Sequence, residues 1–280
     1  MASCLRRDPP GGSAPRTPRD ILPRKKGNGA VVFDPLPWPE GVGRIVLDEV
    51  DSTMSEAARR APTLDRPTWI MAKRQTAARG RRGRSWVNPK GNFAATFIFK
   101  PNGSPAAAAL RSFMAANALF EALAMKVDRD RLSLKWPNDV LLNGGKVAGI
   151  LLESSGAGGR VEWLSIGVGV NLAGVPKGVT DADFPPVSLL SEGGQPCDVH
   201  EMLSMLASNM ATEERIFYEL GFGPIRESWL KKAAKLGEVI TARTARSEIT
   251  GTFETVDEAG QLVLQTSKGR VTIPAADVYF

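Results

Sequence analysis

The sequence of 280 residues predicts an α+β protein, in which a mixed β-sheet with helices is followed by a small C-terminal β-barrel. Two observations predict this fold class. Residues 29–236 alternate short apolar runs, typical of strands, with longer stretches of helical periodicity. From residue 237 the pattern changes to short alternating runs between polar turns, typical of a β-barrel of about 44 residues. Residues 1–28 are rich in Arg, Pro, Gly and Ser, and predict a disordered tail.

The elements of the larger part are expected in a definite order. Apolar runs predict strands at 44–47, 69–73, 93–100, 132–135, 140–142, 146–153 and 161–172. Thr53 and Glu56 fit a capping box, which predicts that a helix over 54–61 begins there. Helical spacing predicts further helices over 105–126, 199–220 and 224–235. Asn143-Gly144-Gly145 tolerates positive φ and predicts a hairpin turn.

Composition narrows the function. The net charge of +6 and the pI of 9.5 favour anionic partners. Cys4 and Cys197 do not resemble a metal site, so a reducing cytoplasm is the expected location. No apolar run is long enough to span a membrane, and no signal peptide is apparent. His200 lies in no triad context and no cluster has zinc spacing, so hydrolysis by covalent or metal-water chemistry is not expected.

The segment RQTAARGRRGRSW, residues 74–86, is called the arginine loop below. It holds five arginines and two glycines, with no acidic residue. Glycine lets backbone amides approach a ligand closely, and guanidinium groups match phosphate and carboxylate oxygens. From this loop alone, a small anionic ligand, nucleic acid and a solvated loop without a ligand are equally favoured.

Further polar residues cluster around the predicted hairpin. Lys146 opens a strand directly after the Gly-Gly turn, and Lys135 lies across the same hairpin region, which brings a second cation near the first. Asp139 follows a proline turn and is a candidate for holding a hydrated Mg²⁺. The stretch IGVGVNL, residues 166–172, carries two glycines within a strand, which indicates close approach of another group to the backbone.

Four of these segments together resemble the catalytic domain of biotin protein ligases, in the family's order and spacing. They are DSTMSEA (51–57), QTAARGRRGRSW (75–86), KWPNDVLLNGGKVAGILLE (135–153) and IGVGVNL (166–172). The family also carries an SH3-like module at its C-terminus, which GTFETVDEAGQLVL (251–264) resembles. The resemblance implies the biotin/lipoate ligase catalytic fold over 29–236 and an SH3-like barrel over 237–280.

The resemblance implies an ATP-dependent ligase. Biotin and Mg-ATP would give biotinyl-5′-AMP and pyrophosphate, and the biotinyl group would pass to a lysine of a biotin carboxyl carrier protein. Both reactants of the first step are anionic, so the protein must supply position and positive charge rather than a nucleophile. A homodimer is left open. No DNA partner is expected, because the proline-rich segment before the catalytic domain does not favour three packed helices.

The resemblance also implies roles for individual residues. Lys146 and Arg79 would be catalytic. Biotin would contact Ser52, Thr53, Gln75, Arg79, Gly80, Arg81 and Lys146. The nucleotide would contact Arg79, Arg82, Arg84, Trp86 and Asn171. Asp139 and Asn171 would hold Mg²⁺.

Two positions depart from the family pattern. Met54 stands where members often have Asn, and Ala78 stands where they usually have Gly. The first removes a polar contact to biotin, and the second stiffens the arginine loop. The alternatives to a biotin ligase are a lipoate or octanoate ligase, a catalytically silent relative that stores the adenylate, and a nucleic-acid-binding protein. The aromatic content of 7% and the absence of an RNP-like or zinc-finger signature disfavour the last.

Overall fold

The computed structural model describes residues 24–25, 31–32, 36–101, 103–176, 184–244, 247–274 and 277–279. The chain forms two units, residues 1–36 and 37–280. In the first unit, strands β1 (Arg24–Lys25) and β2 (Val31–Val32) pair in antiparallel fashion. The expected tail over 1–28 lies outside the described residues except for β1, so its disorder stays a prediction. Everything that follows concerns the second unit.

As far as the chain is described, the larger sheet has seven strands in the order β3-β4-β5-β9-β8-β7-β6. Their bounds are β3 Gly43–Val50, β4 Thr68–Gln75, β5 Phe93–Phe99, β6 Leu132–Lys135, β7 Asp139–Leu142, β8 Gly145–Ala157 and β9 Arg160–Val170. Strands β3 and β4 are parallel and the other neighbours are antiparallel, so the sheet is mixed. The strands predicted from apolar runs are all found; β6 has the predicted ends and the ends of the others are shifted.

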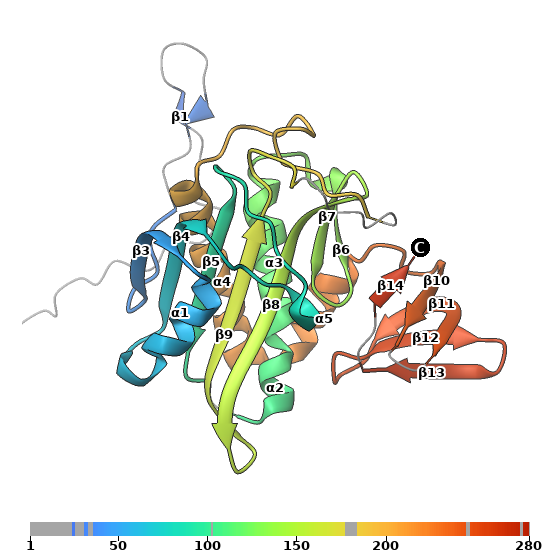
Figure 1. Ribbon diagram of the computed structural model, residues 1–280. Coiled ribbons are helices and arrows are strands. Elements are labelled where there is room, and N and C mark those ends of the chain that lie inside the picture. The colour runs from blue at the N-terminus through green and yellow to red at the C-terminus, as the bar shows by residue number, and fades with distance from the viewer. Residues whose placement is uncertain are drawn as a thin grey trace, which may run out of the picture. The chain divides into compact units, whose positions relative to one another are not determined.

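The helices lie on both faces of this sheet. They are α1 Thr53–Arg60, α2 Pro105–Ala109, α3 Arg111–Ala124, α4 Val199–Leu220 and α5 Phe222–Leu230, with short 3₁₀ turns at Ala61–Thr63, Arg81–Gly83 and Arg129–Arg131. Helix α1 packs on β4, β5 and β9 in front of the sheet in Figure 1, while α3 and α4 lie behind it. The same view shows the arginine loop crossing the front of β9 and β8. No helix in the described part of the chain has the length and apolarity of a membrane span.

Two helix predictions need correction. The helix predicted over 105–126 is interrupted at Leu110, where the Phe113 amide donates to the Leu110 carbonyl (3.1 Å) in a tighter turn. Apolar spacing continues through this turn, so the sequence pattern does not reveal it. The helix predicted over 224–235 runs instead over Phe222–Leu230. It follows Gly221, whose φ of 75° ends α4 and redirects the chain.

The predicted capping box at Thr53 is wrong by one residue. Ser52 is the N-cap, and its hydroxyl oxygen accepts from the Met54 amide (3.2 Å). Glu56 does not reach back to the cap, because its carboxylate pairs with arginines of the same helix. Thr53 instead directs both its amide and its hydroxyl to Gln75. The start of α1 is thereby bonded to the end of β4.

The hairpin turn between β7 and β8 is confirmed. Asn143 and Gly144 have φ values of 50° and 80°. Consecutive positive φ values match the twist of the flanking strands, which explains why this dipeptide stands there. The turn brings β7 and β8 into register so that Leu142 faces Gly145.

The C-terminal segment forms a separate antiparallel sheet in the order β13-β12-β11-β10-β14. Its strands are β10 Val239–Arg243, β11 Glu248–Val256, β12 Leu262–Thr266, β13 Gly269–Ile273 and β14 Asp277–Tyr279. Alternation buries one face, including Ile240, Phe253 and Leu264. Within the described residues β13 and β14 do not pair, so the sheet stays open where a closed barrel was expected. Alternating sequence predicts a buried face but not closure, which depends on how the edge strands meet.

The C-terminal sheet contacts the larger part of the protein. The Trp136 indole nitrogen donates to the Gly260 carbonyl (3.1 Å), and Arg226 donates to the Val256 carbonyl (3.3 Å). Trp136 is 3% exposed, so its N–H needs a partner within the protein. The turn between β11 and β12 therefore satisfies a buried donor that lies beside β6.

Candidate active site

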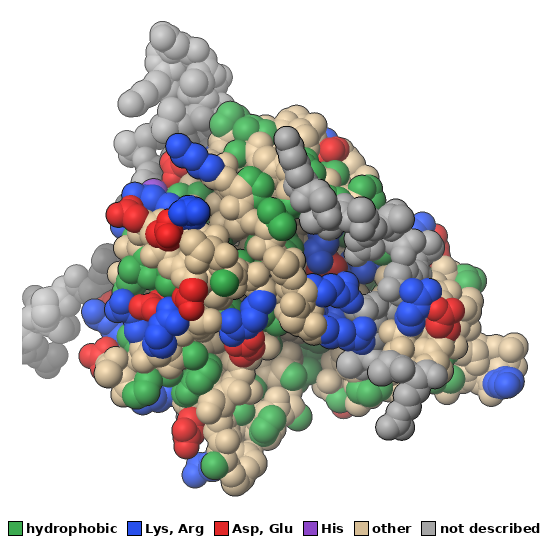
Figure 2. All heavy atoms as spheres, viewed as in Figure 1, with side chains coloured by type: hydrophobic (Ala, Val, Ile, Leu, Met, Phe, Trp, Pro, Cys, Tyr) green, Lys and Arg blue, Asp and Glu red, His purple; other side chains and the backbone are tan. Residues whose placement is uncertain are grey.

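A cavity of about 210 Å³ opens on the face of the sheet that the arginine loop crosses. It collects most of the site residues named from the sequence: Ser52, Thr53, Gln75, Arg79, Gly80, Arg81, Arg84, Trp86, Asp139, Lys146 and Asn171. In Figure 2 basic side chains gather at the hollow in the middle of this face. Segments that lie far apart in sequence thus line one cavity.

The arginine loop folds back on itself above the cavity. The Gly80 amide donates to the Arg84 carbonyl (2.7 Å), and the Trp86 amide donates to the Ala78 carbonyl (3.0 Å). Arg82 has a φ of 55° at the tip, and its side chain is exposed. Of the predicted ligand contacts, all of which are described, Arg82 is the one that does not line the cavity. Successive arginines in so tight a turn face different directions, which residue type and spacing alone do not reveal.

Two lysines lie beside a carboxylate where β6, β7 and β8 meet. Lys146 Nζ lies 2.8 Å from Asp139 Oδ1, and Lys135 Nζ lies 3.9 Å from Asp139 Oδ2. Lys135 also lies 4.0 Å above the centre of the Phe184 ring. The Lys135 and Asp139 side chains are only 10% and 13% exposed, so in the described part of the chain two cations and a carboxylate lie together at this end of the cavity. The second cation expected from the sequence is therefore present.

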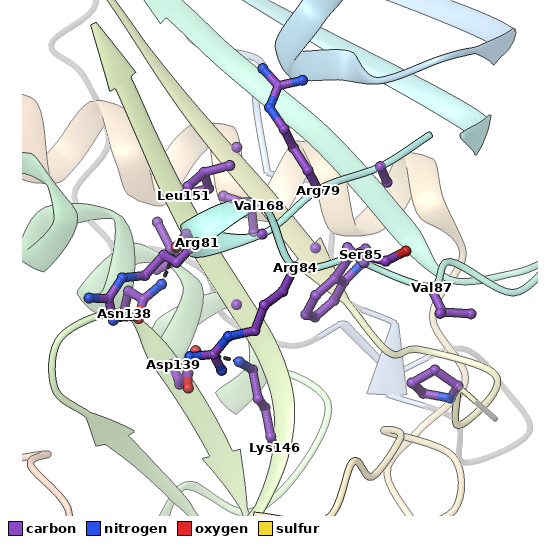
Figure 3. Close-up of a pocket in the computed structure, with 18 of the residues that line it drawn as sticks. Arg79, Arg81, Arg84, Ser85, Val87, Asn138, Asp139, Lys146, Leu151 and Val168 are labelled. Carbon is purple, nitrogen blue, oxygen red and sulfur yellow. Dashed lines mark hydrogen bonds and ion pairs between the residues drawn. The ribbon is translucent and has the colours of Figure 1, made fainter. Parts of the chain in front are cut away.

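Arg79 is held at a distance from this group. Its Nε and one terminal nitrogen donate to the Glu153 carboxylate (3.0 and 2.8 Å), and its other terminal nitrogen donates to Ser55 Oγ (2.7 Å). These bonds hold the pKa of Arg79 above its usual range. Figure 3 shows Arg79 pointing away from Lys146, while Arg84 points toward Asp139 and Lys146. The sequence reasoning missed Glu153, because nothing distinguishes it from an ordinary strand carboxylate.

Arg81 reaches the other side of the cavity. Its guanidinium donates to Asn138 Oδ1 (3.3 Å), and Asn138 Nδ2 donates to the Ile150 carbonyl (2.5 Å). Figure 3 shows this pair beside the strands that carry Leu151 and Val168. Asn138 therefore links the arginine loop to β8 and orients Arg81 along the cavity wall.

The end of the cavity near α1 is polar and well ordered. Gln75 Oε1 accepts from the Thr53 amide (2.7 Å) and from the Thr53 hydroxyl (3.1 Å). The Thr96 hydroxyl, which is fully buried on β5, donates to Thr53 Oγ1 (2.9 Å). The three residues expected to hold a polar ligand group, namely Ser52, Thr53 and Gln75, are thus brought together at one end.

The floor of the cavity is made by glycines on paired strands. Gly149 faces Gly169 across β8 and β9, and the Trp86 indole lies on both. A Cβ at Gly169 would stand 2.7 Å from the indole, and a Cβ at Gly167 would stand 2.7 Å from the Met54 sulfur. The predicted close approach to these glycines is therefore confirmed. The Trp86 indole nitrogen is buried without a hydrogen-bond partner in the described part of the protein.

Asn171 lines the cavity, but its amide is already engaged. Its nitrogen donates to the Val187 carbonyl (3.0 Å), and its oxygen accepts from Asn92 Nδ2 (3.2 Å). Among the described residues, no group of three or more His, Cys, Asp or Glu side chains could hold a metal ion. Asp139 is the carboxylate that faces the cavity beside Lys146. Among the described residues, a metal that arrives with a phosphate ligand would find one carboxylate here rather than a complete protein cage.

Both parts of the chain are similar to known proteins. Residues 46–171 match the model of the biotin/lipoate A/B protein ligase family, and residues 235–280 match the biotin protein ligase C-terminal domain. The chain is 50% identical to a biotin–[acetyl-CoA-carboxylase] ligase of Paracoccus denitrificans, over 84% of the chain and 99% of the relative. It is 30% identical to the bifunctional ligase/repressor BirA of Escherichia coli, over 81% of the chain and 70% of that protein.

A solved structure gives the same picture. The biotin protein ligase of Aquifex aeolicus in complex with biotin and ATP superposes with a TM-score of 0.71 at 26% identity. The match covers 84% of the chain and 98% of the Aquifex protein. The likeness is therefore one of overall architecture as well as of local motifs.

Proposed function

Because the chain belongs to the biotin protein ligase family, we propose that it activates biotin with ATP and transfers it to a biotin carboxyl carrier protein. The first step forms a bond between a biotin carboxylate oxygen and the α-phosphorus of ATP, and pyrophosphate leaves. In the second step the amine of an acceptor lysine attacks the acyl carbon, and AMP leaves. The observation that carries the proposal is the joining of cations from the arginine loop and from β8 in one cavity with a polar far end.

In the proposed reaction Lys146 is the principal cation. Its Nζ can exchange the Asp139 carboxylate for the biotin carboxylate or for an α-phosphate oxygen, since all are anionic oxygens. Arg84 points to the same place (Figure 3), and Lys135 lies within reach of the same carboxylate. Fixed cations beside the reacting oxygens stabilise the charge that develops on the phosphate. Arg79 would join them only after it leaves Glu153.

The remaining side chains position the substrate and exclude water. Ser52 and Gln75 suit the polar ureido group of biotin, while Trp86 and Met54 provide an apolar cover over the glycines. A closed arginine loop would shield the mixed anhydride from hydrolysis. Gly80 matters here because its amide already closes the loop on Arg84.

Magnesium fits this proposal through Asp139. The ion commonly binds by one or two carboxylates together with nucleotide phosphates, and Asp139 supplies one carboxylate at the cavity wall. Asn171 also lines the cavity and stays a predicted ligand, although its amide oxygen already accepts one hydrogen bond from Asn92. The ion would neutralise phosphate charge when it binds with ATP.

The proposal also names partners and location. The acceptor would be a carrier domain of acetyl-CoA carboxylase or of a similar carboxylase, as the name of the Paracoccus relative suggests. A cytoplasmic location rests on the sparse cysteines, of which Cys197 is a free thiol. We include neither DNA binding nor a membrane partner, and a homodimer stays open as a prediction from the resemblance.

Exchange of labelled pyrophosphate into ATP tests the first half of the reaction. Purified protein is expected to show exchange that depends on biotin, because adenylate formation is reversible. Mass spectrometry of a carrier domain incubated with protein, ATP and biotin is expected to show one biotinyl group on a lysine. Exchange supported by lipoate or octanoate in place of biotin would show that the related ligase activity is the correct one.

A further inference from the structure

A chain of three hydrogen-bonded side chains runs from the interior of the protein to the polar end of the cavity. It begins at Thr96, which is fully buried on β5 and does not line the cavity. The Thr96 hydroxyl donates to Thr53 Oγ1 (2.9 Å), and the Thr53 hydroxyl donates to Gln75 Oε1 (3.1 Å). Gln75 stands at the end of this chain on the cavity wall.

The donor-to-acceptor direction of these hydrogen bonds follows from the Thr53 backbone. A backbone amide can only donate, and the Thr53 amide lies 2.7 Å from the Gln75 side chain. The atom that it meets must therefore be the amide oxygen of Gln75. Because the Thr96 hydroxyl donates to Thr53, the Thr53 hydroxyl proton is directed to the same oxygen. The Gln75 nitrogen is left facing the other way, with two N–H donors.

Ser52 adds a donor of the same kind. Its hydroxyl oxygen accepts from the Met54 amide (3.2 Å), so its proton is available to another acceptor. Among the described residues, none accepts a hydrogen bond from the Ser52 hydroxyl or from the Gln75 nitrogen. Ser52 is 2% exposed, and a buried donor without a partner costs free energy. Both groups therefore favour a ligand atom that accepts.

We propose that Thr96 is a positioning residue that acts through Thr53 to hold Gln75 with its nitrogen toward the ligand, so that this end of the cavity selects a group presenting an acceptor oxygen. The proposal rests on the proposed function, in which that oxygen is the ureido oxygen of biotin. Thr96 makes no contact with the ligand. Its substitution is therefore expected to change how tightly the ring is held and not the rate of the chemical step.

The first test separates KM from kcat in biotin-dependent pyrophosphate exchange. Thr96→Val keeps the shape and removes the hydroxyl, and is expected to raise KM for biotin about fivefold to tenfold with kcat within about twofold of wild type. Thr96→Ser restores the hydroxyl and is expected to return KM toward the wild-type value. Thr68→Val is the matched control, since Thr68 is 3% exposed and its hydroxyl donates to a backbone carbonyl (3.0 Å) away from the cavity.

The second test compares two ligands, and its deciding result comes from the wild-type protein. In 2-iminobiotin an imino group replaces the ureido oxygen, and its protonated form offers N–H donors where biotin offers an acceptor. Wild-type protein is expected to prefer biotin strongly in the exchange assay, and Thr96→Val is expected to narrow that preference. Equal use of 2-iminobiotin and biotin by the wild type would overturn the selection of an acceptor oxygen, whether or not the variants fold.

The outcomes distinguish this inference from the proposed function. Absence of biotin-dependent exchange in the wild type would reject the proposed function itself. Normal exchange together with an unchanged KM in Thr96→Val would reject only the role of Thr96. Thr96 would be merely structural if Thr96→Val and Thr68→Val both lowered kcat and the melting temperature. The same conclusion would follow if Thr96→Ser failed to restore KM.

Discussion

Replacing Gly169 by alanine is expected to displace Trp86 from the cavity floor. The new Cβ would stand 2.7 Å from the indole Nε1 and Cε2 atoms, whereas non-bonded heavy atoms rest at about 3.5–4.0 Å. The indole must therefore retreat by about 1 Å. At Gly149 the same substitution brings Cβ to 3.3 Å from the ring, so a shift of a few tenths of an ångström suffices. Neither glycine has positive φ, so backbone strain does not contribute.

The two alanine variants should therefore differ in activity more than in stability. A displacement of about 1 Å beside reacting groups can lower the rate about 100-fold, so kcat/KM for biotin-dependent exchange should fall by that order in Gly169→Ala. Gly149→Ala should lose much less. The melting temperatures should stay close, because Trp86 sits on a partly exposed loop that can move. Equal losses in both variants, or full activity in Gly169→Ala, would refute the role given to the indole.

Three further variants test the charges. Lys146→Ala should lower kcat about 100- to 1,000-fold, which corresponds to about 2.7–4 kcal/mol. Lys73→Ala is the control: it loses an exposed ion pair of the same length (2.8 Å) and should stay active. Arg79→Ala should release biotinyl-5′-AMP faster on rapid gel filtration while binding of free biotin changes less, and unchanged leakage would contradict a bridging role. Burial raises the pKa of Glu213, so the folded state is disfavoured once pH exceeds that pKa. Glu213→Gln should therefore raise the melting temperature near pH 8, and the gain should vanish near pH 3, where the carboxyl is protonated in both states; a pH-independent gain would point to packing instead.

Periodicity predicted the elements of this fold well, because most strands and helices bury one regular face. The exact ends of α4, Val199–Leu220, follow from an N-cap at Asp198 and a glycine beyond the last turn. The break at Leu110 and the open C-terminal sheet were not predictable in the same way. Both depend on how separate segments meet, and a local pattern of apolar residues carries no information about that.

The candidate site likewise has features that the sequence predicts and features that it does not. The motifs predicted that Arg84, Lys146 and Gln75 share one cavity, and the structure brings them together from the end of β4, the loop that follows it and the start of β8. The motifs could not give the direction of each guanidinium. Arg79 faces Glu153 because that carboxylate lies farther along β8, beyond Leu151, and Arg82 faces solvent because the loop turns at that residue.

Val278 of β14 lines the same cavity as Lys146, although it belongs to the C-terminal sheet. The boundary near residue 237 therefore separates two architectures, but both contribute to the same cavity. Chimaeras that graft this sheet from one relative onto the larger domain of another would inherit a foreign patch in the pocket wall. Exchange of this C-terminal sheet should therefore change ligand preference. For the same reason, substitutions in the two parts of the chain are expected to be correlated in evolution.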